Sequence, residues 1–324
     1  MSNFAKNQAQ SLLEGAVSGK EATAEKIAGT WEQSQAKYFS KLLWPSIILL
    51  TTITILPVIF LIVTSFTSWD LSRPGSLVFT GLKNYVRIFS KDPRFWNSVT
   101  VQIKLSLMTV PAQIVIGLGL AVFVHEKIKH SFLIEMARGV FIIPMVIPPI
   151  VAALIWKILF TPPVSILNYV VTSVGGSQLA WLGDPNLALV AIAVASVWEF
   201  FPFCFLLLYA GLLSLPEEPY EAAMVDGASR WQSFRYVTLP LLGPTLSIVL
   251  LFRLVDSIRS FPMIYVMTSG GPGFATEPTN FYAYQQAFSY SYIGYSSSMI
   301  VVVLAFSMIL TGIILRNINW HRGD

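Results

Sequence analysis

Six long apolar stretches dominate the chain and alternate with shorter polar segments. They run over residues 42–68, 99–124, 139–160, 187–214, 242–268 and 294–315. A bilayer core about 30 Å thick is crossed by roughly 20 helical residues, and each stretch reaches that length. We therefore expect an all-α membrane protein whose domain over residues 42–315 contains six transmembrane helices, a bundle rather than a barrel.

Several prolines fall inside these stretches. Among them are Pro57, Pro111, Pro148, Pro149 and Pro202. Proline removes a backbone hydrogen bond from a helix, so these positions predict bends whose freed carbonyls are satisfied by neighbouring helices.

Composition supports the membrane assignment and excludes several other classes. Of 324 residues 54% are hydrophobic and 12% charged, the mean hydropathy is +0.64, and a soluble domain has about 25% charged residues. The net charge of +4 comes from cations spread between the apolar stretches, which does not indicate nucleic-acid binding. The single cysteine, Cys204, excludes an internal disulfide and a cysteine-based metal site, and its apolar surroundings favour a packing role.

The distribution of Lys and Arg predicts the orientation of the helices. Residues 1–41 are polar and lack the apolar core of a signal peptide, which is typical of a cytoplasmic tail. The side holding both ends of the chain has 12 Lys and Arg and the other side has 5, so we expect both termini, including the tail over residues 316–324, in the cytoplasm. All five outer cations lie in the first outer loop, where the spacing of Tyr85, Ile88 and Phe89 predicts a short amphipathic helix that meets lipid headgroups.

The polar segment over residues 215–240 contains closely spaced signals for helix ends. Pro216 and Pro219 suit a first helical turn, Gly227 permits a left-handed stop, and a second helix is expected from about Ser229. From the residues alone the segment is either two interfacial helices or a loop on which another protein docks.

A resemblance distinguishes these interpretations. Residues 221–244, EAAMVDGASRWQSFRYVTLPLLGP, resemble the EAA loop of permease subunits in the carbohydrate-uptake branch of ATP-binding-cassette (ABC) importers. Further similarity covers most of residues 80–315, and within the branch the chain is similar to permeases of importers of alginate oligosaccharides. The matching positions include Pro144, Pro148, Trp156, Asn168, Trp181, Trp198, Pro202, the run from Met267 to Thr276, Tyr284, Phe288 and Gly294. Ser165 and Ser269 stand where the family has glycine, so the geometry of the outer loops is expected to differ slightly.

The resemblance implies a type I permease fold and a set of partners in a bacterial inner membrane. A second permease, expected to be a different chain, would complete the pathway, two ATPase subunits would bind ATP and Mg²⁺, and an extracytoplasmic solute-binding protein would deliver the substrate. This chain would bind no cofactor itself. Its coupling helix would comprise Glu221, Ala222, Ala223, Asp226, Gly227 and Ala228.

Charged residues within the spans are candidates for the translocation pathway. Charges cost about 2.5–3.5 kcal/mol each on insertion scales, so they normally face a bundle interior or a water-filled cavity. Arg253, Asp256 and Arg259 recur every third residue and predict either a polar face on the pathway or an internal Arg–Asp pair. Glu199 has no partner in sequence, whereas Lys104 and Lys157 lie near span ends and are expected to snorkel towards the interface.

The sign of these charges suggests a substrate class. The spans hold four cations and two carboxylates, which favours an acidic oligosaccharide such as an alginate fragment, with Phe261 and Tyr265 facing its sugar rings. The opposing interpretation is that the charges are structural, as in carriers of neutral sugars.

No catalytic or metal-binding pattern accompanies these features. Gly19-Lys20 lacks the earlier glycine of a phosphate-binding loop, and His125, His130 and His321 lack metal-ligand spacing. A secondary transporter would show inverted repeats, which we do not find, and a membrane enzyme would need a polar catalytic cluster, which only the region of Asp256 approaches. We therefore expect a transport subunit that is not itself an enzyme.

Overall fold

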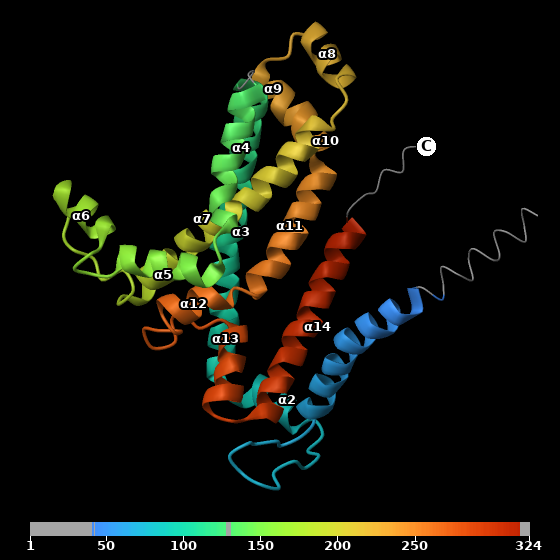
Figure 1. Ribbon diagram of the computed structural model, residues 1–324, viewed down its shortest axis with the longest axis vertical. Coiled ribbons are helices and arrows are strands. Elements are labelled where there is room, and N and C mark those ends of the chain that lie inside the picture. The colour runs from blue at the N-terminus through green and yellow to red at the C-terminus, as the bar shows by residue number, and fades with distance from the viewer. Residues whose placement is uncertain (1–40, 42, 128–130, 318–324) are drawn as a thin grey trace, which may run out of the picture. The chain divides into compact units, whose positions relative to one another are not determined.

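The computed structural model describes residues 41, 43–127 and 131–317 (Figure 1). The chain divides after Phe60 into two units. The described residues of the first unit are helical. Nearly all of the predicted N-terminal tail lies outside the described residues, as do His130, His321 and residues 318–324.

Four helices are individually long and apolar enough to cross a membrane. They are Leu43–Ser65, α3 (Pro93–Lys127), α7 (Pro185–Leu213) and α14 (Ile293–Asn317). Two bent pairs of helices raise the number of possible spans to six, in agreement with the predicted all-α fold. Among the described residues the β-structure amounts to one isolated bridge, between Thr67 and Phe79.

The first bent pair occupies the third predicted span. Here α4 (Ser131–Val146) and α5 (Pro149–Phe160) meet at 89°. Pro148 and Pro149 lie at the bend, because Pro148 precedes the first turn of α5 and neither proline has a backbone N–H. Pro111 and Pro202, by contrast, lie inside continuous helices.

The second bent pair leads into the fifth predicted span, which is shorter than the sequence suggests. A chain of short helices, α9 (Arg230–Ser233), the π-helix η1 (Phe234–Thr238) and α10 (Leu239–Leu241), meets α11 (Gly243–Ile258) at 66°. The expected helix over 242–268 is interrupted at Arg259 and Ser260, and α12 (Phe261–Met267) follows. Pro262 in the first turn of α12 cannot donate a backbone hydrogen bond to the preceding turn, which accounts for the interruption.

The main packing contact of the second unit joins α3 to α7. Gly117 allows it, because a Cβ at this position would lie 2.6 Å from the Cβ of Cys204. Cys204 is fully buried among apolar side chains, which agrees with the predicted packing role.

Shorter helices lie at the ends of these long ones (Figure 1). They are α2 (Lys83–Lys91), α6 (Ile166–Ser173), α8 (Glu218–Val225), α13 (Thr279–Tyr284) and the π-helix η2 (Gln285–Ser289). The predicted amphipathic helix is present as α2, whose Ile88 is buried and whose Tyr85 shares a 2.6 Å hydrogen bond with Ser65. At α6, Ser165 caps the helix by accepting a hydrogen bond from the backbone N–H of Asn168.

Candidate functional site

The segment over residues 215–240, which we call the coupling segment, consists of α8 and a second helical run formed by α9, η1 and the start of α10, joined by a tight turn. After α8, Gly227 has a φ of +75°, the left-handed conformation predicted from the sequence. The N–H of Gly227 donates to Met224 and the N–H of Ala228 donates to Ala223, at 3.1 and 2.9 Å. This pair of hydrogen bonds is a Schellman motif, which fixes the direction in which the chain leaves the helix.

A capping box starts the next helix immediately after this turn. The Ser229 hydroxyl accepts from the backbone N–H of Gln232, whose side-chain oxygen accepts from the N–H of Ser229 at 2.7 Å. Between α8 and η1, Tyr220 donates its hydroxyl hydrogen to Thr238 at 3.1 Å. Local hydrogen bonds therefore hold the two helices of the coupling segment at a defined angle.

The surface of the coupling segment is exposed and partly apolar. No residue of α8 is buried, and Val225 is 87% exposed and Met224 67% exposed. Two residues after the segment, the buried Leu242 packs against Gly211 of α7, where a Cβ would lie 2.9 Å from the leucine side chain. The segment thus presents an apolar surface outward, and the chain that follows it is held in the packing of the long helices.

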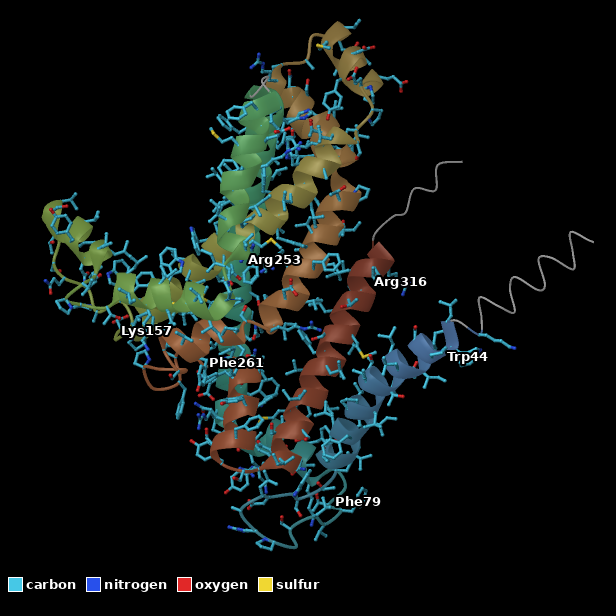
Figure 2. All side chains as sticks on the ribbon, in the orientation of Figure 1. Trp44, Phe79, Lys157, Arg253, Phe261 and Arg316 are labelled. Atoms are coloured by element: carbon cyan, nitrogen blue, oxygen red, sulfur yellow. The ribbon has the colours of Figure 1, made fainter. Side chains whose placement is uncertain are left out.

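Arg253 lies midway along α11 and is almost completely buried (Figure 2). Its Nε donates to the side-chain oxygen of Gln113 on α3 at 2.9 Å, and one terminal nitrogen contacts Asp256 at 3.2 Å. Gln113 in turn donates to the backbone oxygen of Ser196 on α7. Arg253 therefore connects three helices, and the internal Arg–Asp pair is one of the two interpretations that the sequence left open.

Arg253, Asp256 and Arg259 differ in their exposure to solvent. Asp256 is partly exposed, and Arg259 is exposed beyond the end of α11. Glu199 on α7 is 2% exposed, and its Oε2 has no hydrogen-bond partner among the described residues. Lys157 is exposed, and its ammonium group donates to the backbone oxygen of Val266 on α12 at 2.8 Å.

Aromatic side chains gather after the interruption at Arg259. We call Phe261, Tyr265, Phe281, Tyr284 and Phe288 the aromatic cluster. The rings of Phe261 and Tyr265 are stacked with centroids 5.5 Å apart, and Tyr284 lies 4.8 Å from Phe261. Tyr265 is 48% exposed and Phe288 74% exposed, so the cluster has an accessible side. The spacing of residues 281, 284 and 288 on one helical face could have indicated the members that the sequence analysis did not select.

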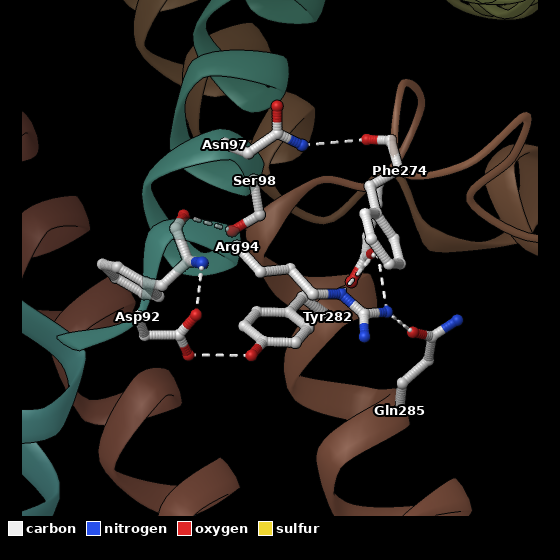
Figure 3. A network of polar contacts seen from close by, with 9 residues as sticks. Asp92, Arg94, Asn97, Ser98, Phe274, Tyr282 and Gln285 are labelled. Atoms are coloured by element: carbon white, nitrogen blue, oxygen red, sulfur yellow. Dashed lines mark hydrogen bonds and ion pairs between the residues drawn. The ribbon is translucent and has the colours of Figure 1, made fainter.

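A buried polar network that was not predicted from the sequence joins the start of α3 to α13 and α14 (Figure 3). We call Asp92, Arg94, Glu277, Tyr282 and Tyr295 the Asp92 network. The Asp92 carboxylate accepts hydrogen bonds from the hydroxyls of Tyr282 and Tyr295 and from the backbone N–H of Phe95. Arg94 forms a 2.9 Å ion pair with Glu277 and lies over the rings of Phe274 and Tyr282.

Burial and hydrogen bonding move the pKa values of this network in opposite directions. Burial alone raises the pKa of Asp92, but hydrogen bonds from the hydroxyls of Tyr295 and Tyr282 and from the backbone of Phe95 and Arg94 together outweigh it, and the net pKa is below the ordinary 3.8. Burial raises the pKa of Glu277 above its ordinary value, and Arg94 offsets only part of this effect. No group of three potential metal-binding side chains occurs in the part of the chain that the structure describes.

Long apolar helices, two bent pairs and a capped, exposed segment between two of the spans are typical of a membrane transport subunit. The family described as the binding-protein-dependent transport system inner membrane component matches residues 113–319. The chain belongs to this family, whose members are permease subunits of ABC importers and leave ATP hydrolysis to separate subunits. It is therefore a multi-pass protein of the inner membrane.

Two relatives carry names that mention their substrates. The chain is 34% identical to the trehalose/maltose transport system permease protein MalF of Thermococcus litoralis, over 82% of this chain and 89% of that protein. It is 35% identical to the sulfoquinovosyl glycerol transport system permease protein SmoG of Agrobacterium fabrum, over 86% and 89%.

A solved structure shares the fold. It is the crystal structure of a bacterial ABC transporter involved in the import of the acidic polysaccharide alginate, with a TM-score of 0.74 and 18% identity over 88% of this chain and 96% of that chain. The fold is thus that of an ABC importer permease, as the sequence analysis expected.

Proposed function

We propose that this chain is one permease of an importer that moves an oligosaccharide from a binding protein into the cytoplasm. A second, different permease completes the pathway, and two ATPase subunits bind ATP and Mg²⁺. The observation that carries the proposal is the coupling segment, whose capped helices keep a fixed shape while exposing Met224 and Val225. A sugar as substrate is supported by the names of MalF and SmoG.

In this proposal the coupling segment seats in a groove of the ATPase. The contact residues are Glu221, Ala222, Ala223, Asp226, Gly227 and Ala228. Because Leu242 packs into α7 through Gly211, a displacement of α8 passes to the long helices as a rigid-body movement. Both termini are then cytoplasmic, and the Asp92 network and α2 lie on the outer side.

Crosslinking tests this arrangement directly. A cysteine at Val225 should crosslink to the ATPase subunit and stay unlabelled by an impermeant thiol reagent applied outside intact cells. The matched control is a cysteine at Ser173, which is exposed on α6 and should show the opposite behaviour. Cys204 is buried and does not interfere. Labelling of the Val225 cysteine from outside contradicts the proposed orientation.

For the substrate, we propose an acidic oligosaccharide that passes the aromatic cluster and Arg259. Flat aromatic faces suit the apolar faces of sugar rings, and Arg259 is an exposed cation next to them in the chain, three residues after Asp256 of the predicted pathway. The solved structure with the same fold belongs to an importer of the acidic polysaccharide alginate, which supports this class. Arg253 contributes less than its charge suggests, because Asp256 and Gln113 already bind its guanidinium.

Replacing Arg259 tests the choice of substrate. Arg259→Gln keeps much of the side-chain volume and should lower ATPase stimulation by an acidic oligosaccharide more than by a neutral one of equal length. Lys104→Gln is the matched control, since Lys104 is also an exposed cation within a predicted span. Equal losses with both sugars would leave Arg259 without a role in selecting anions.

A further inference from the structure

Three cations form a stripe along α2. Lys83, Arg87 and Lys91 are spaced four residues apart, so they lie on one side of the helix, and all three are exposed. The helix itself contains no Asp or Glu. In the part of the chain that the structure describes, none of the three forms an ion pair, and Arg87 lies over the ring of Tyr295 at 4.1 Å.

The acids of the proposed outer side are all engaged elsewhere. Asp70 pairs with Arg73 at 3.4 Å, Glu277 pairs with Arg94, and Asp92 accepts the tyrosine hydroxyls. Asp184 accepts backbone hydrogen bonds at the start of α7. Two of the five outer cations thus have carboxylate partners within the chain, whereas the three on α2 have none among the described residues.

An apolar ridge borders the stripe. Leu82, Val86 and Phe89 are 64, 54 and 50% exposed, and Trp96 at the start of α3 is 48% exposed. A shallow depression is lined by Leu82 and Val86 together with the three cations. Since α2 leads into α3 through Asp92 alone and Arg87 packs on the first turn of α14, the helix lies where two spans begin.

We propose that α2 binds the headgroup of an anionic phospholipid. The lipid phosphate would lie against Lys83, Arg87 and Lys91, with its glycerol and upper acyl region against Leu82 and Val86. This inference depends on the proposed function in one respect: the proposed orientation places the bound lipid in the outer leaflet. Exposed apolar side chains next to the cations favour a lipid over an acidic protein surface, which would meet the cations but leave the ridge in contact with water.

Site-directed fluorescence quenching tests this proposal in the assembled transporter. Ser90 is exposed on α2, and a bimane-labelled cysteine there, in a Cys204→Ser background, reports the lipids nearby. Two preparations are compared, both in phosphatidylcholine nanodiscs. One contains brominated phosphatidylglycerol, and the other contains the same share of brominated phosphatidylcholine. We expect stronger quenching by phosphatidylglycerol. Each cation should raise the preference for this lipid over phosphatidylcholine by up to about fivefold, equivalent to about 1 kcal/mol.

Two sets of variants separate charge from other effects. The preference should disappear in K83Q/R87Q/K91Q, persist in the charge-conserving K83R/K91R, and persist in Arg73→Gln, which removes a cation of the same loop outside the stripe. If the triple variant does not assemble, the single changes Lys83→Gln and Lys91→Gln should each reduce the preference. Size-exclusion chromatography verifies assembly before each measurement.

Several outcomes overturn the proposal. Equal quenching by the two lipids, or a preference unchanged in the triple variant, excludes a lipid site on α2. If the triple variant keeps the lipid preference but binds the solute-binding protein more weakly, the stripe is a protein-docking surface instead. Failure here leaves crosslinking of the Val225 cysteine unaffected, whereas failure of that crosslink overturns the proposed function and not the lipid site.

Discussion

The coupling segment and the Asp92 network occupy opposite ends of the second unit and keep their shapes in opposite ways (Figure 1). In the coupling segment, the hydrogen bonds of the Schellman motif and the capping box join residues at most five apart in sequence. In the Asp92 network the ion pair from Arg94 to Glu277 spans 183 residues and the hydrogen bond from Tyr295 to Asp92 spans 203. One region is exposed and the other is largely buried.

The two kinds of contact have different consequences for the stability of the folded protein. Local caps let an exposed segment hold a fixed form without a core of its own, so a substitution there should disturb its contact with a partner more than the fold. Buried contacts between distant elements stabilise the folded state directly. The following predictions test this contrast, from the largest expected effect to the smallest.

Removing Arg94 should produce the largest loss of stability. Arg94→Gln leaves the Glu277 carboxylate 2% exposed without its partner, and breaking a buried ion pair on one side costs about 3–5 kcal/mol. We expect a loss of about 3 kcal/mol or less, because the side chain of Arg94 is 21% exposed. Thermal unfolding in nanodiscs measures the effect as a lower Tm.

The partner variant provides the control for this prediction. Adding Glu277→Gln to Arg94→Gln removes the unpaired charge and should recover part of the lost stability. Without Arg94 the pKa of Glu277 rises further, so folding binds a proton and the Arg94→Gln protein should lose stability as the pH rises above 4.5. A double variant no more stable than the single one would mean that the ion pair is not what Arg94 contributes.

Replacing Asp92 should cost about 1.5–3 kcal/mol, because hydrogen bonds to a charged acceptor are lost. An Asn at this position has one oxygen, so it cannot accept from both tyrosine hydroxyls and the N–H of Phe95 as the carboxylate does. The folded-state pKa of Asp92 is lowered, so its contribution is present above 3.8 and is lost as the pH falls through the folded value. The difference in Tm between the wild-type protein and Asp92→Asn should therefore shrink on acidification, and a constant difference would contradict a charged Asp92.

In the coupling segment, Gly227→Val should abolish transport while the protein still assembles. A Cβ at Gly227 meets no atom within 4 Å, so the cost is backbone strain of about 1–2 kcal/mol at φ +75° and not a clash. That strain would change the angle between α8 and α9. In proteoliposomes, ATP hydrolysis should no longer drive transport, and the Tm should change little.

A graded series at the same position serves as the control. Asn tolerates the left-handed conformation better than Ala, and Ala better than Val, so transport should decrease in that order. Normal transport by Gly227→Val would show that the left-handed turn is not needed for coupling.

The same contrast explains which features the sequence could predict. Gly227 and Ser229 were identified because glycine at a helix end and serine at a helix start act on neighbouring residues. Six apolar stretches likewise indicated up to six spans, since length and hydropathy are local properties.

Contacts between distant elements were not predictable in this way. Nothing near Arg253 in the sequence points to Gln113 on another helix, and Asp92 and Tyr295 are separated by most of the chain. The interruption at Arg259 was also missed, although Pro262 was a usable signal, because the apolar run continues through it. Partners of buried polar groups depend on how the helices pack, which a single sequence does not specify.

The smallest expected effect concerns Ser269, a position at which the family resemblance predicts glycine. Ser269 adopts a φ of +51°, so the loop keeps a left-handed conformation, and its hydroxyl donates to the backbone oxygen of Tyr265 at 3.0 Å. Ser269→Gly relieves strain of about 1–2 kcal/mol, but it loses a hydrogen bond of about 0.5–1.5 kcal/mol and gains unfolded-state entropy of about 0.5–1 kcal/mol. These terms nearly cancel, and the Tm should hardly change, whereas Ser269→Ala keeps the strain, loses the hydrogen bond and should be less stable than both. A large loss in Ser269→Gly alone would show that the serine is less strained than its φ suggests, so that the lost hydrogen bond and the added unfolded-state entropy outweigh the relief of strain.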